Sequence, residues 1–66
     1  MNRIRISEQI MAYRRTNNVS QGEFGKLMGV SAQAVSKWEC EKTYPDITLL
    51  PALAKILSCQ INDFFT

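Results

Sequence analysis

The sequence predicts an all-α fold in which five short helices share one hydrophobic core. Apolar residues recur at helical spacing through most of the chain, capping signals precede two of the helical segments, and no alternating strand pattern occurs. A length of 66 residues allows one domain at most. With 45% hydrophobic and 21% charged residues, the composition is that of a folded domain and excludes a disordered chain.

The first helix is predicted from about residue 6 to the pair Asn17-Asn18. Ile6, Ile10 and Tyr13 fall at positions i, i+4 and i+7, which is the spacing of one helix face. Asparagine tolerates the left-handed conformation in which helices commonly end. The two consecutive asparagines therefore suit a turn after this helix.

Two further helices are predicted in close succession over residues 21–40. Ser20 and Glu23 have the spacing of a capping box at the start of the second helix. Gly29 is expected to end that helix with a positive φ, and Ser31 to cap the third. Two short helices joined by a three-residue turn that contains glycine form a helix-turn-helix motif.

The C-terminal third is predicted to add two more helices. The polar stretch 41–46 ends in Pro-Asp and indicates a loop. A fourth helix is expected to start at Asp46 or Thr48, with Pro51 in its first turns, where proline costs least. A short fifth helix is expected at residues 61–65.

The predicted core includes one aromatic residue in each helix of the motif. Phe24, Val35, Trp38 and Leu53 lie on the apolar faces of their helices. Glycine inside a helix costs about 0.5–1 kcal/mol relative to alanine, so Gly25 needs a structural reason. We expect it to let the following helix approach the second helix closely.

The composition offers little for catalysis or metal binding. The chain has no histidine, which removes the usual general base and the commonest metal ligand. Cys40 and Cys59 alone cannot complete a zinc site. We therefore expect no enzyme activity, no cofactor and no small-molecule site. The absence of a signal sequence and of a transmembrane run predicts a cytoplasmic protein with no membrane partner.

The charge distribution favours a polyanionic partner at the N-terminal two-thirds. Residues 1–42 carry a net charge of +3, whereas residues 43–66 carry −1. A polyanion would meet the first part, and the second suits packing or self-association. On charge alone, an ordinary solvated surface explains the pattern equally well.

Three stretches together resemble the Cro and phage-repressor (XRE) family of helix-turn-helix DNA-binding domains. They are Ser20–Ser31, Val35–Glu39 and Tyr44–Asp46, the last followed by leucines at helical spacing. The resemblance covers residues 6–65 and implies a compact five-helix repressor-like domain. It also implies a transcriptional regulator, expected to be a repressor, that binds a pseudo-palindromic operator in double-stranded DNA as a homodimer.

The chain departs from the family pattern at five positions. Phe24 and Gly25 stand where leucine and alanine are usual, which suggests a compensated exchange of volume in the core. Glu41 and Ser58 stand where the family commonly has glycine, and Gln60 replaces a serine cap. These differences affect the expected helix ends more than the fold.

The resemblance makes residues 32–40 the recognition helix in the major groove. Gln33 and Lys37 occupy positions that contact bases in similar repressors. A glutamine amide can pair with N6 and N7 of adenine, and a lysine favours guanine, although Lys37 suits a phosphate equally well. Ser36 can read a base edge or permit close approach, and the Ala32 methyl group can meet a thymine methyl.

Other positions carry over as DNA-backbone contacts or as structural groups. Gln21, at the start of the second helix, corresponds to the phosphate clamp of the family. Arg14 and Glu39 correspond to a partly buried ion pair between the first and third helices. Two further sets complete the expected site: flanking phosphate contacts at Ser31, Lys42 and Thr43, and a dimer interface at Leu57, Ile61, Phe64 and Phe65.

An alternative function on the same fold is a protein-interaction module, such as an antitoxin or an anti-repressor partner. It predicts that Gln33 and Lys37 are dispensable for function and that Phe65 is essential. The DNA-binding hypothesis predicts instead that Gln33 and Lys37 are needed for function.

Overall fold

The computed structural model describes residues 5–58 and contains no strand in that range. The prediction of an all-helical chain is confirmed for this part. The expected fifth helix at residues 61–65 lies outside the described residues. The described elements are four α-helices and one 3₁₀ turn: α1 (Ile6–Asn17), α2 (Gln21–Met28), α3 (Ala32–Glu39), η1 (Ile47–Leu49) and α4 (Leu50–Ile56).

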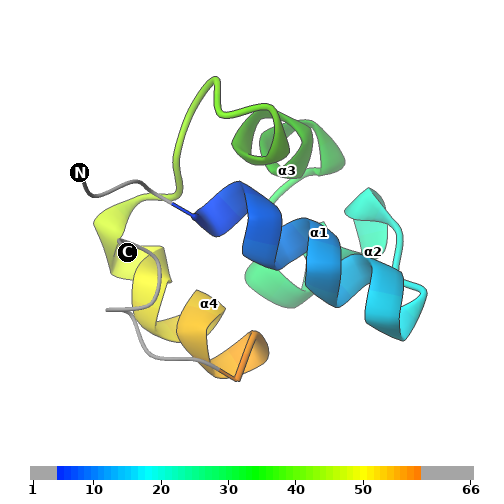
Figure 1. The fold of residues 1–66 in the computed structure, drawn as a ribbon. Helices are drawn as coiled ribbons and strands as arrows, with labels where there is room; N and C mark the ends of the chain where they lie inside the picture. Colours follow the sequence, from blue (N-terminus) through cyan, green and yellow to red (C-terminus); the bar gives the residue numbers. More distant parts are fainter. Residues whose placement is uncertain (1–4, 59–66) are drawn as a thin grey trace.

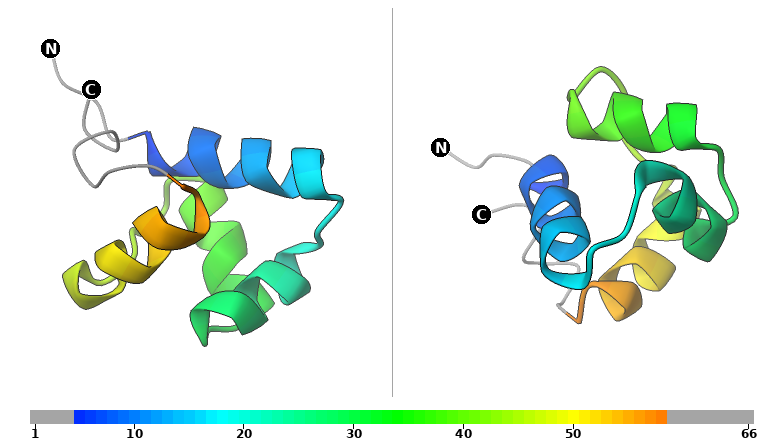
Figure 2. Two further views of the ribbon diagram at one scale, coloured as in Figure 1. Left: turned by 90° about the horizontal axis from the view of Figure 1, so that it is seen from below. Right: turned by 90° about the vertical axis from the view of Figure 1, so that its right-hand side faces the viewer.

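The helix-turn-helix prediction requires that the second and third helices pack together. α2 and α3 pack against each other, and α1 packs against α3 from another side. In Figures 1 and 2, α2 and α4 lie toward opposite ends of α1. The side of α3 that faces away from α1 is left uncovered by any other described helix.

The start of each helix in the motif follows from local hydrogen bonds. Ser20 Oγ accepts from the Glu23 amide at 3.0 Å, and Glu23 Oε1 accepts from the Ser20 amide at 2.9 Å. Ser31 Oγ accepts from the Ala34 amide at 3.2 Å. Gly29 ends α2 with a φ of 76°. These contacts satisfy amide groups that would otherwise lack partners, and they confirm the predicted capping signals.

Nine apolar side chains from the four α-helices form the core. The four predicted core residues are confirmed, because three are fully buried and Trp38 is only 5% exposed. The Tyr13 ring meets the Phe24 ring edge to face, with centroids 5.6 Å apart. The full set is Ile6, Ile10, Phe24, Met28, Val35, Trp38, Leu50, Leu53 and Ala54.

The fourth helix begins later than the sequence predicts. A 3₁₀ turn occupies residues 47–49, and α4 starts at Leu50. Asp46 caps this turn by accepting from the Thr48 amide at 2.9 Å. Pro51 has no N–H, so it cannot donate to the Ile47 carbonyl as a continuous α-helix from Asp46 would require. The tighter turn avoids that missing bond.

Gly25 allows a close approach to the backbone of α2, as predicted. The segment that approaches is the turn between α2 and α3, and not α3 itself. A Cβ atom at this position would lie 2.5 Å from the carbonyl oxygen of Val30 and 3.2 Å from the backbone of Ser31. The Val30 amide donates to the Gly25 carbonyl at 2.8 Å. The missing side chain therefore lets the turn between α2 and α3 pack directly against α2.

The helix ends at Glu41 and Ser58 keep a left-handed backbone although neither residue is glycine. Their φ angles are 60° and 55°. After α3, the Lys42 amide donates to the Lys37 carbonyl at 2.9 Å, and the Glu41 amide to Trp38 at 3.2 Å. This is the Schellman pattern, which normally has glycine at the left-handed position. The geometry typical of glycine is thus retained at a cost in backbone energy.

We expect the substitution Glu41→Gly to stabilise the domain by about 0.5–1 kcal/mol. The left-handed conformation costs a residue with a side chain roughly 1–2 kcal/mol, and the greater freedom of glycine in the unfolded chain offsets part of that gain. Urea unfolding should show a higher midpoint at an unchanged slope. Glu41→Ala removes the same charge but keeps a side chain at the left-handed position. An equal gain in stability in this control would contradict the explanation.

Candidate nucleic-acid interface

The exposed side of α3 carries a stripe of polar side chains opposite its buried face. Val35 and Trp38 point into the core, whereas Gln33, Lys37 and Cys40 are exposed and Ser36 is half-buried. Residues three and four apart lie on one face of a helix, so the four polar residues form one line. Ala32, the first residue of α3, is exposed at the end of this stripe.

A shallow depression follows this stripe, and we call it the α3 surface. Its lining residues are Gln33, Ser36, Lys37, Cys40 and Lys42. Lys42 joins it because the chain turns back after α3, where the amides of Lys42 and Thr43 both reach the Lys37 carbonyl. Two ammonium groups and two uncharged polar side chains line the depression, and no carboxylate does. This arrangement suits a polyanion that offers hydrogen-bond acceptors.

Glu39 anchors the opposite side of α3 to the first two helices. Arg14 donates from Nε to Glu39 Oε2 at 2.7 Å and from Nη2 to Oε1 at 3.0 Å, so the pair is bidentate. The Gln21 side-chain amide donates to the same Oε1 at 3.1 Å. The Glu39 side chain is only 7% exposed and that of Arg14 is 24% exposed. One carboxylate therefore links α1, α2 and α3.

The electrostatics of this network favour its charged form. Burial raises the pKa of the Glu39 carboxyl, but the hydrogen bonds from Arg14 and Gln21 and the Arg14 charge outweigh it and hold the pKa below the usual 4.5. The hydrogen bond with Glu39 raises the pKa of Arg14. Arg14 also donates from Nη1 to the Val19 carbonyl at 3.2 Å. Its guanidinium is thus committed within the protein.

Gln21 has a structural contact that the sequence reasoning missed. The resemblance assigned it to a phosphate, yet one N–H of its side-chain amide is bound to Glu39. A glutamine amide has two N–H groups, so the second remains for another acceptor. Gln21 and Glu39 lie 18 residues apart on different helices, and no local sequence signal indicates this contact.

The remaining expected site residues are dispersed around the two ends of α3 and beyond. Ser31 is exposed and already uses its Oγ to cap α3, and Thr43 is exposed after the helix. Leu57 is half-buried beside the outer face of α1, far along the chain from the α3 surface. Three of the four expected interface residues lie outside the described residues: Ile61, Phe64 and Phe65.

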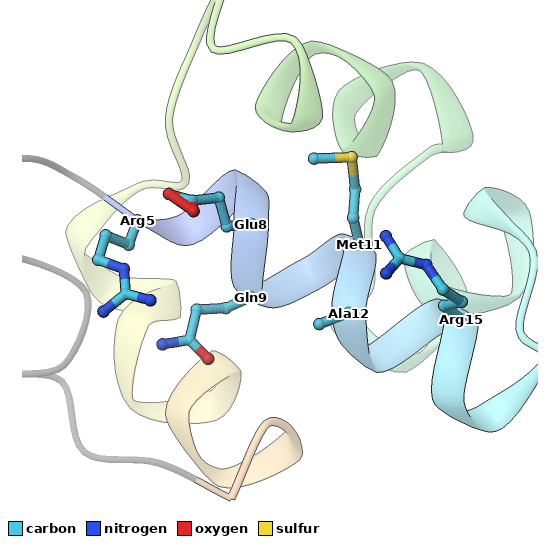
Figure 3. A pocket seen from close by; sticks show the side chains of 6 residues that line it. All are labelled: Arg5, Glu8, Gln9, Met11, Ala12 and Arg15. Atoms are coloured by element: carbon cyan, nitrogen blue, oxygen red, sulfur yellow. The ribbon is translucent and has the colours of Figure 1, made fainter.

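A second depression lies along α1, and its composition does not indicate a binding site. Figure 3 shows side chains of both charges, amide and apolar groups spread along one helix and the residue before it, Arg5, with no convergent set. Within residues 5–58, no group of three or more metal-binding side chains is placed to hold an ion. No helix in the same range is long and apolar enough to cross a membrane.

The fold and the α3 surface define a helix-turn-helix domain, and the chain belongs to the helix-turn-helix family HTH_3, whose model matches residues 10–64. It is 41% identical over 60 residues to Repressor protein C2 of Salmonella phage P22. It is 30% identical over 61 residues to the HTH-type transcriptional activator BcrR of Enterococcus faecalis. These regions cover 91% and 92% of the chain but only 28% and 30% of the relatives, so the chain spans less than a third of either.

Two solved structures of the P22 protein have the same fold. The P22 c2 repressor in complex with a synthetic operator matches with a TM-score of 0.79 at 37% identity, covering 89% of each chain. The solution structure of the DNA-binding domain of the same repressor matches with a TM-score of 0.75, covering 89% of this chain and 78% of that one. The family resemblance found in the sequence is thereby confirmed.

We expect the substitution Glu39→Gln to destabilise the domain and to flatten its acid unfolding. Because the pKa of Glu39 is lower in the folded state, its contribution is complete above the unfolded value of about 4.5 and is lost as the pH falls through the folded value. Removing the Glu39 charge weakens its hydrogen bonds with Arg14 and Gln21 and should cost about 1–3 kcal/mol at neutral pH. Urea midpoints measured between pH 7 and pH 2 should show both effects.

Glu23→Gln is the matched control for this experiment. The pKa of Glu23 is also lowered, first by the Ser20 backbone hydrogen bond, but its side chain is exposed and contacts only the capping box. A pH profile for Glu39→Gln that is as steep as that of the unmodified protein would contradict the assigned role of Glu39.

Proposed function

We propose that residues 6–65 form a domain that binds specific sequences in double-stranded DNA and regulates transcription, as a repressor. The observation that carries this proposal is the α3 surface, a line of exposed polar and cationic side chains on the outer side of the second helix of a helix-turn-helix. The likeness to a repressor solved with its operator supports the same conclusion. If this domain belongs to a longer protein, transcriptional regulation by that whole protein is likewise proposed.

In this mechanism α3 enters the major groove, which is about 12 Å wide and admits one helix. Gln33 and Lys37 then face base edges, Ser36 permits close approach, and the Ala32 methyl group meets a thymine methyl. The core contacts of Val35 and Trp38 hold the helix from behind. The Glu39 network fixes α3 relative to α1 and α2, so the polar stripe is presented without reorganisation.

Phosphate contacts position the domain on the duplex from both ends of α3. We assign Lys42 and Thr43 to the strand beside the C-terminal end, and Ser31 to the strand beside the N-terminal end. Gln21 contributes its backbone amide and the second N–H of its side chain at the start of α2. We assign Arg14 no DNA contact, because its charge is paired with Glu39 and three of its five N–H groups are bonded within the protein.

We further propose a homodimer on a pseudo-palindromic operator. One module of this size buries only about 600–1,000 Å² on DNA, and two copies with recognition helices about 34 Å apart read one face of the duplex. The C-terminal residues Leu57, Ile61, Phe64 and Phe65 are the proposed interface.

We propose a cytoplasmic location and no cofactor, metal, small-molecule ligand or enzymatic activity. The alternative is a protein-interaction module such as an antitoxin or an anti-repressor partner.

We expect operator affinity to fall with the logarithm of salt concentration at a slope of about −4 to −5 for a dimer. Each neutralised phosphate contributes about −0.9 to this slope, so neutralisation of two or three phosphates per subunit gives this range. Lys42→Ala should make the slope shallower by about 2 in a dimer and weaken all sequences alike. Fluorescence anisotropy of a labelled duplex at several salt concentrations measures both. A flat salt response of the unmodified protein would contradict DNA binding.

We expect Phe65→Ala to shift the protein from dimer to monomer in equilibrium sedimentation at micromolar concentration. The substitution removes an apolar side chain from the proposed interface, and the loss of the second subunit should also weaken operator binding. Gln33→Ala should leave the oligomeric state unchanged. A protein that stays monomeric both with and without operator DNA would overturn the dimer proposal.

A further inference from the structure

The α3 surface holds two side chains whose hydrogen-bonding groups match different purines. Gln33 and Lys37 are both exposed, line the same depression and lie four residues apart on one helix. Ser36 between them is small and half-buried, so it leaves room for a base edge beside each of them. An α-helix rises 1.5 Å per residue, which places the two positions about 6 Å apart along the axis.

The DNA helix rises 3.4 Å per base-pair step along its axis. A helix lying along the major groove is inclined to that axis, so a separation of about 6 Å spans about one to two steps. Gln33 and Lys37 are therefore brought to different base pairs. The two residues do not compete for one base, and each can add its own preference.

The position of Lys42 favours one of the two roles that the sequence left open for Lys37. Lys42 lies on the loop after α3, at the end of the α3 surface, and is exposed. Residues on loops that flank the recognition helix commonly contact the DNA backbone, whereas exposed residues of the helix itself can reach base edges. We therefore assign the phosphate to Lys42 and the base contact to Lys37.

We propose that each operator half-site contains an adenine read by Gln33 and a guanine read by Lys37, about one to two base-pair steps apart. The glutamine amide donates to N7 and accepts from N6 of adenine, and the lysine ammonium donates to O6 and N7 of guanine. This inference rests on the proposed DNA-binding function and names the sequence that the α3 surface selects.

The test is selection of bound duplexes from a randomised pool by the full 66-residue chain. Four variants are compared with it: Gln33→Ala and Lys37→Ala, and as matched controls Gln9→Ala on α1 and Lys55→Ala on α4. Neither control residue lines the α3 surface. None of the four substituted residues belongs to the buried core. Thermal unfolding of each variant shows whether it remains folded before selection.

We expect the unmodified chain and both controls to enrich half-sites with adenine and guanine at this spacing. Gln33→Ala should lose the preference for adenine and keep that for guanine, and Lys37→Ala should do the reverse. A wrong base pair at either position should weaken binding by the unmodified chain by about 5- to 150-fold. A duplex with 7-deazaadenine or 7-deazaguanine at the read position lacks N7, so it should weaken binding only where the matching side chain is present.

Two kinds of failure are distinguishable. If the unmodified chain enriches a motif without these purines, or if either α3 variant keeps the full preference, the base assignment is wrong and DNA binding stands. If no motif is enriched and binding does not depend on sequence, the proposed function fails as well.

Discussion

The carboxylate of Glu39 is the group on which the geometry of the motif depends. It accepts two hydrogen bonds from Arg14 on α1 and one from Gln21 on α2, while it belongs to the last residue of α3. Packing of apolar side chains holds α3 close to its neighbours, but such contacts have little directionality. Charged hydrogen bonds fix the direction as well, so this network sets the orientation of α3 relative to α1 and α2.

The same network makes a small domain sensitive to single changes. A chain of this length has only a few kcal/mol of net stability, which is comparable with the cost of leaving Glu39 buried without its partner. The left-handed backbone conformation at Glu41 and Ser58, which end their helices without glycine, also lowers the stability of the domain. The core of nine apolar residues and the two capped helix starts offset these costs.

Local signals in the sequence were sufficient for much of the fold. Ser20, Glu23 and Ser31 form hydrogen bonds within three residues, so the starts of α2 and α3 could be predicted without knowledge of the rest of the chain. The start of α4 could not be placed as well. There the missing amide of Pro51 and the Asp46 cap together favour a 3₁₀ turn before α4. The periodicity of apolar residues is the same whether the helix starts before or after this turn.

The sequence by itself determined the helical class, the motif, the four core residues that it named and the polar stripe on α3, because these follow from helical spacing and from local cap and turn signals. Only the tertiary structure decided that Gln21 binds Glu39, because this contact joins two helices and depends on how they pack. The structure also shows that Gly25 faces the turn at Val30 and that Lys42 lines the α3 surface with Lys37. These two contacts follow the reversals of the chain after α2 and α3, which local hydrogen bonds at the helix ends close.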